Sequence, residues 1–262
     1  MAGRGAEDLI RTICTIADTQ VRFEYLVSVL RERSAADIGP LLDAICARAE
    51  QAEPDARAVM TSLVMALHDP AVADALQHLR EEAVGGGLLS LERAIRSPAM
   101  THASGLPEDP DEDRVPDYGR GRPLTLGERK SLARKPDRGT MERLLRDPHP
   151  EVIARLLANP RLTEDDVLAM AVKRPARADV LTQIALNVRF GSRPRIRRAL
   201  VLNPDTPPDL AASISALLLR QELRLVVESP QVNAALRALC MEHLERRPPG
   251  EERDDSDSDV LQ

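Results

Sequence analysis

The sequence predicts an all-α protein in which an N-terminal helical bundle precedes a solenoid of short helical repeats. Three observations lead to this prediction. Pairs of apolar residues recur four and three residues before a proline along the second half of the chain. Apolar residues recur at helical spacing through the first half. Aromatic residues make up only 2% of the chain, and cores of Leu, Ala, Val and Ile suit thin helical layers better than β-sandwiches.

Residues 1–96 are expected to form the N-terminal helical domain. Ser34 and Asp69 each precede an apolar run and are expected to be N-caps, because their side chains can accept hydrogen bonds from the first backbone N–H groups of a helix. Gly85 to Gly87 should end the longer helices of this domain. The expected helices are a helix or helix pair over 6–32, one after Ser34, one over 54–68, one after Asp69 and a short one over 88–95.

Two segments are expected to be disordered. Residues 97–123 combine prolines, glycines and an acidic run, a composition typical of a linker. Residues 247–262 are polar and acidic and should form a disordered tail. Residues 124–246, between these segments, should hold the repeats.

A repeated phrase of two apolar residues, two others and a proline predicts the short helices of the repeat region. Its prolines are Pro136, Pro148, Pro160, Pro175, Pro204 and Pro230, at separations of 12, 12, 15, 29 and 26 residues. Proline ends one helix and suits the first turn of the next, and a 12-residue unit leaves room for about 8 helical residues. Such a short helix is marginal in water, so its neighbours must hold it in place.

The residues before these prolines should lie outside the α conformation, because the proline ring clashes with it. Four of them are polar: Asp147, Asn159, Asn203 and Ser229. We expect them to be N-caps of the helices that follow. The carboxylates of residues 164–166 follow Thr163 and should mark another helix start, where acidic groups favour the helix dipole.

The phrase resembles the leucine-rich repeat variant family, a bacterial relative of HEAT and armadillo repeats. The resemblance rests on Asp147 to Val152, Leu156 to Pro160 and Leu202 to Leu210, and covers roughly residues 125–245. It implies a HEAT-like solenoid. One type of member carries a cysteine-ligated iron–sulfur cluster before its repeats, but this chain has only Cys14, Cys46 and Cys240, so that property does not transfer.

Charge is the most informative functional signal. Residues 119–200 hold 19 Lys and Arg against 9 Asp and Glu, a net charge of +10 in a chain whose formal net charge is −6. Arginine favours two-pronged contact with carboxylate or phosphate, so this block is expected to bind a protein with an acidic surface. The expected partner-binding residues surround a break in the repeat spacing: Arg189, Phe190, Arg193, Arg195, Arg197 and Arg198.

Two alternatives stand beside this expectation. The block 119–200 could be balanced by the acidic segments of the chain itself. It could instead bind nucleic acid, although single-strand binders usually add aromatic stacking platforms and Phe190 is the only aromatic residue inside the block.

No motif for catalysis, a cofactor or a metal is present in the sequence. No two histidines stand four residues apart, no Cys-x-x-Cys exists, and nucleotide-binding loops and nucleophile elbows are absent. We therefore expect a non-enzymatic adaptor or regulator without cofactor or metal. The chain also looks like bacterial cell-polarity regulators that assist a small GTPase or its activating protein. Neither a signal peptide nor an apolar run of ~20 residues is found, so a cytoplasmic location without a membrane span is expected.

Overall fold

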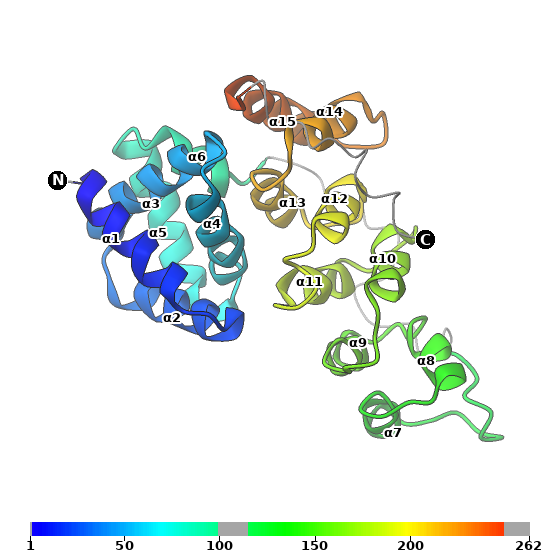
Figure 1. The fold of residues 1–262 in the computed structure, drawn as a ribbon. Helices are drawn as coiled ribbons and strands as arrows, with labels where there is room; N and C mark the ends of the chain where they lie inside the picture. The colour runs from blue at the N-terminus through cyan, green and yellow to red at the C-terminus, as the bar shows by residue number, and fades with distance from the viewer. Residues whose placement is uncertain (1, 99–114, 249–262) are drawn as a thin grey trace, which may run out of the picture.

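A computed structural model describes residues 2–98 and 115–248 of the chain (Figure 1). These residues form α-helices and one short 3-10 helix, and no β-strand occurs among them. The all-α prediction is therefore confirmed for this part of the chain. Residues 99–114 of the expected linker and residues 249–262 of the expected tail lie outside the described residues.

The N-terminal bundle is built around α3, which packs against α1, α4, α5 and α6. The expected segment 6–32 is a helix pair that separates before Asp18, whose side chain accepts from the backbone N–H groups of Gln20 and Val21. Ser34 and Asp69 are N-caps as predicted. The elements are α1 (Ala2–Thr15), α2 (Thr19–Glu32), α3 (Ala35–Glu50), α4 (Pro54–Leu67), η1 (Pro70–Val72), α5 (Ala73–Gly85) and α6 (Leu89–Ile95).

The second part of the chain consists of short helices that follow one another in an arc (Figure 1). Helices α7 to α14 have 7 to 9 residues each, close to the predicted length. They are α7 (Leu126–Leu132), α8 (Arg138–Leu144), α9 (Pro150–Leu157), α10 (Glu164–Val172), α11 (Ala178–Leu186), α12 (Pro194–Leu202), α13 (Pro208–Ser215) and α14 (Arg220–Glu228), followed by α15 (Ala234–Arg246).

Many of these helices pack against the second helix along the chain as well as against the next one. One row contains the contacts α7–α9 and α9–α11, and the other contains α10–α12 and α12–α14. Contacts between successive helices, such as α12–α13 and α14–α15, join the rows. Buried Leu, Ile and Val side chains from both rows fill the space between them.

The prediction that Asp147, Asn159, Asn203 and Ser229 are N-caps is wrong. The N-caps of the helices that follow them are His149, Thr163, Pro207 and Asn233. The physical reason is that one residue after Pro148, and three after each of the other prolines, separate the phrase from the next helix, so the pre-proline side chain lies at the end of the preceding helix.

The buried asparagines of the phrase connect one helix end to another. The amide nitrogen of Asn203 donates to the carbonyls of Ala171 and Lys173, at 2.8 and 3.0 Å, at the C-terminal end of α10. Asn159 donates in the same way to the carbonyl of Arg134, 3.3 Å away, just after α7. Each bond satisfies carbonyls that a helix end leaves without partners, and each joins helices of one row.

The bundle and the second part of the chain pack directly against each other. Helix α6 contacts α13, and polar side chains cross the seam. Arg80 pairs with Asp209 at 3.2 Å and Arg96 with Glu242 at 2.8 Å. The guanidinium of Arg247 donates to the carbonyl of Ala49 at 2.8 Å. The bundle therefore braces the arc near α13 and α15.

Candidate functional site

The structure disperses the six residues that the sequence predicts as a partner-binding cluster. Phe190 is buried, with 2% of its surface exposed. The guanidinium of Arg189 lies 4.7 Å from the centre of that ring and donates to the carbonyls of Asn159 and Leu162, at 3.0 and 2.8 Å. These two residues hold the loop after α9 against the turn that precedes α12.

Arg193 and Arg195 face carboxylates at the start of α10. Arg195 pairs with Asp165 at 2.9 Å, and Arg193 lies 4.0 Å from Glu164. Both arginines are more than half exposed, so water screens these pairs and each contributes little to stability. The pairs nevertheless neutralise the densest part of the basic block. The third carboxylate of this cluster, Asp166, forms the predicted capping box with Thr163.

Arg197 points toward the bundle instead of the solvent. Its guanidinium donates to the hydroxyl of Thr61 at 3.3 Å. Burial, with a contribution from the nearby cation of Arg57, lowers the pKa of Arg197 to about 10. Arg198 is half-buried on α12. The predicted cluster is therefore divided among a loop, the start of α10 and the seam with the bundle.

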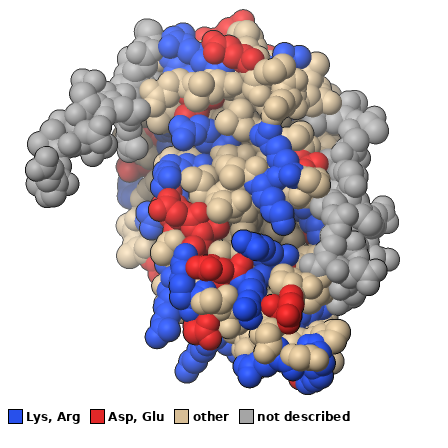
Figure 2. Space-filling model, turned by 90° about the vertical axis from the view of Figure 1, so that its right-hand side faces the viewer, with Lys and Arg blue, Asp and Glu red and all other residues tan. Residues whose placement is uncertain are grey.

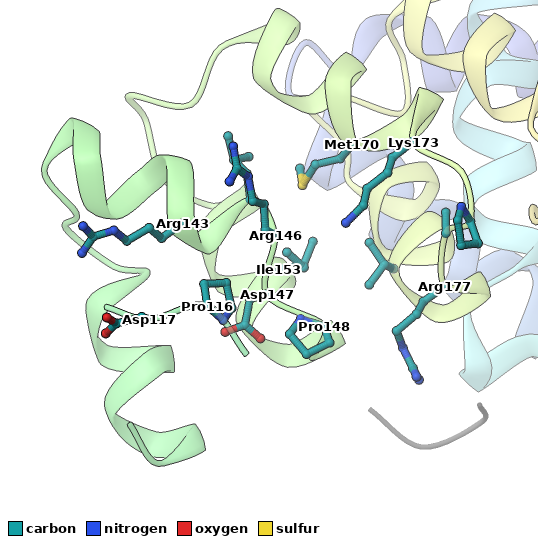
Figure 3. A pocket seen from close by; sticks show the side chains of 14 residues that line it. Pro116, Asp117, Arg143, Arg146, Asp147, Pro148, Ile153, Met170, Lys173 and Arg177 are labelled. Atoms are coloured by element: carbon teal, nitrogen blue, oxygen red, sulfur yellow. The ribbon is translucent and has the colours of Figure 1, made fainter. Parts of the chain in front are cut away.

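A cavity between α8, α9, α10 and α11 gathers a different set of cations. Its volume is about 610 Å³. Leu145, Ile153, Met170 and Val180 supply apolar lining. Figure 3 shows Arg143 and Arg146 on one side of the cavity and Lys173 on the other, with the lysine side chain directed toward the centre. The basic residues of the lining are Arg143, Arg146, Lys173 and Arg177.

The repeated phrase places two of these cations. Arg146 and Lys173 both occupy the third position of the phrase, two residues before its proline. This position follows the apolar pair and is exposed in both copies, beside the ends of α8 and α10. Two copies of the phrase therefore each place a cation in the lining of one cavity.

The acidic side chains of the lining form no ion pair with Arg143, Arg146 or Lys173. Asp147 is fully buried and paired with Arg129 at 2.9 Å, and it also accepts a hydrogen bond from the hydroxyl of Tyr118 at 2.7 Å. Asp117 accepts from the backbone N–H of Gly119 at 2.7 Å. Within residues 2–98 and 115–248, no carboxylate forms an ion pair with Arg143, Arg146 or Lys173, the rim cations.

The charge of the cavity extends onto the surface around it. Figure 2 shows Lys and Arg spread over the face that carries α8 and α10, with carboxylates between them. The three rim cations surround an apolar floor, so a ligand that matches the cavity carries negative charge and one or more apolar groups. Sequence reasoning missed this site because its residues lie in three separate stretches. The recurring cation in the third position of the phrase was the signal that pointed to it.

Other chemistry finds little support among the described residues. They contain no group of three or more His, Cys, Asp or Glu side chains that could hold a metal ion. Burial raises the pKa of the Cys240 thiol to about 12, so it stays protonated and unreactive at neutral pH. No single described helix is long and apolar enough to cross a membrane, and α4 with the following η1–α5 segment passes that test only as a pair bent by 86°.

Comparisons with protein-family models, with curated proteins and with solved structures give no match for this chain. The resemblance of the phrase to leucine-rich repeat variant proteins therefore stays a prediction.

Proposed function

We propose that this chain is a non-enzymatic adaptor or regulator whose HEAT-like repeats, residues 124–246, bind an acidic segment of a protein partner in the cavity between α8 and α11. The observation that carries the proposal is the set of rim cations, Arg143, Arg146 and Lys173, around an apolar floor and without ion pairs to described carboxylates. The two rows of short helices support a HEAT-like solenoid, because each helix depends on its neighbours for burial.

Several features favour a protein segment over nucleic acid as the ligand. The cavity is concave, and much of its lining is apolar. Tyr118 and Phe190, at the edge of the basic block and inside it, are both buried and offer no stacking platform. Following the likeness to bacterial cell-polarity regulators, the partner would be a small GTPase or its activating protein.

The proposal is tested with a short labelled peptide of Glu and Ser that contains a single Leu. Its binding to the full chain is followed by fluorescence anisotropy. Reversing two rim charges with Arg146→Glu and Lys173→Glu should weaken binding by about tenfold or more, because attraction becomes repulsion. The matched control is Arg195→Glu, an exposed arginine that already pairs with Asp165, and it should leave the affinity nearly unchanged.

The same variants are compared in affinity capture from native lysate. Proteins that depend on the cavity should be retained by the wild type and by Arg195→Glu and lost from the double variant, with helical circular dichroism preserved. Equal capture by all three proteins would refute the proposal. A gel shift with duplex DNA whose affinity falls with salt at a log–log slope near −0.9 for each neutralised phosphate would favour the nucleic-acid alternative.

A further inference from the structure

We infer that the cavity is also the docking site of the chain's own acidic segment, Glu251 to Leu261, which competes there with the partner. This inference rests on the proposed function of the cavity. The segment carries negative charge and apolar side chains in the combination that the cavity favours: the carboxylates of Glu251, Glu252, Asp254, Asp255, Asp257 and Asp259, then Val260 and Leu261.

The order of residues in the segment fits the arrangement of the cavity. In an extended peptide, alternate side chains point to opposite sides, and each residue advances the chain by about 3.3 Å. Asp257 and Asp259 would then share one side and could meet the rim cations. Val260 would point to the other side, toward the floor at Ile153, Met170 and Val180.

The segment is long enough to reach the cavity. The described chain ends at Pro248, just after α15. Helix α15 packs against α14, α14 against α12, and α12 against α10, whose C-cap is Lys173. Three such steps of about 10 Å each give roughly 30 Å. The residues from 249 to Val260 span about 40 Å when extended.

Docking within one chain would weaken partner binding by a measurable factor. A segment tethered to the same chain has an effective concentration on the order of 1 mM when its connection can span the distance to the site. With a dissociation constant on the order of 0.1 mM for the isolated segment, the cavity would be occupied about nine-tenths of the time, and partner affinity would fall about tenfold.

The test measures binding of the Glu, Ser and Leu peptide to full-length variants of the chain. In the first variant the six carboxylates of the segment become amides, and we expect about tenfold tighter binding than in the wild type. The charge-matched control changes six exposed carboxylates of the bundle to amides and should bind like the wild type. These are Glu7, Asp8, Glu24, Glu32, Asp74 and Glu81. Ser256→Ala with Ser258→Ala, which keeps the segment's charge, should also have no effect.

The outcomes separate this inference from the function on which it rests. If the wild type and the neutral-segment variant bind the peptide equally, while Arg146→Glu with Lys173→Glu abolishes binding, docking of the segment is refuted and the proposed function stands. If the rim reversal has no effect in either background, both are refuted. If the increase in peptide affinity depends on the concentration of the chain, the segment of one copy docks on another copy, and this would contradict docking within one chain.

Discussion

At the scale of single residues, the region next to the cavity depends on one buried ion pair. The side chains of Arg129 and Asp147 are 1% and 0% exposed, and Tyr118 adds a hydrogen bond to the same carboxylate. Burial, followed by this hydrogen bond to Asp147, raises the pKa of the Tyr118 hydroxyl. Asp147 therefore holds Arg129 of α7 and Tyr118 at the wall of the cavity. Because its charge is already paired with Arg129, it does not repel an acidic ligand.

Removing this carboxylate should destabilise the fold strongly. Asp147→Ala leaves the buried guanidinium of Arg129 without its carboxylate, at an expected cost of about 3–5 kcal/mol in the free energy of unfolding. Asp165→Ala, which breaks an exposed pair, should cost less than about 1 kcal/mol. Urea unfolding of both variants checks the difference, and equal losses would show that the buried pair is not the stronger one.

A second residue-scale prediction concerns His243, which lies at the seam with the bundle. It is 1% exposed, and burial, together with the cations of Arg247, Arg93, Arg96 and Arg246, lowers its pKa to about 3. At this position the unfolded chain binds a proton below about pH 6.5, whereas the folded chain does not. This histidine therefore does not reduce the stability of the fold above that pH, and it reduces it progressively as the pH falls toward 3.

Between pH 7 and pH 5 this histidine should account for about 2 kcal/mol of lost stability. His243→Leu should therefore be less sensitive to acid than the wild type when urea unfolding is measured at both pH values. His78→Leu, which changes an exposed histidine of α5, should keep the wild-type response. An unchanged acid response in the His243 variant would contradict this assignment.

At the scale of elements, the asparagine bonds explain how such short helices hold together. Asn159 and Asn203 each connect the end of one helix to the end of its neighbour in the same row. The helices and their lengths could be predicted from the sequence, because the prolines and apolar pairs impose them locally. The hydrogen-bond partners of the pre-proline side chains could not be predicted, because the carbonyls that accept from Asn159 and Asn203 lie 25 and 32 residues earlier in the sequence.

Substituting one of these asparagines should destabilise the row. Asn203→Ala removes the donor for two carbonyls at the end of α10, and burying such unsatisfied groups costs about 1–3 kcal/mol. The control, Ser229→Ala, changes the same position of the phrase where the side chain is half-buried, and should stay within about 0.5 kcal/mol. Thermal unfolding of the two variants compares them, and equal melting temperatures would exclude the asparagine's role.

At the scale of the whole molecule, the sequence predicted the basic block but not which of its basic residues lie close together in the fold. Residues two apart on a helix point to nearly opposite sides, so Arg195 faces α10 while Arg197 faces the bundle. Arg146 and Lys173 are 27 positions apart in the numbering, yet they line one cavity because α8, α9, α10 and α11 surround it. The candidate site follows from the stacking of repeats, which no single stretch of sequence displays.

The central claim is that an acidic segment with an apolar anchor binds in the cavity between α8 and α11. The most direct test places a photoreactive leucine at the apolar position of the Glu, Ser and Leu peptide and irradiates its complex with the full chain. Mass spectrometry then identifies the attached residues. The account predicts attachment at the cavity floor, at Ile153, Met170 or Val180, and its loss in the rim-reversed variant. Attachment confined to α12 and the turn around Phe190 would contradict it.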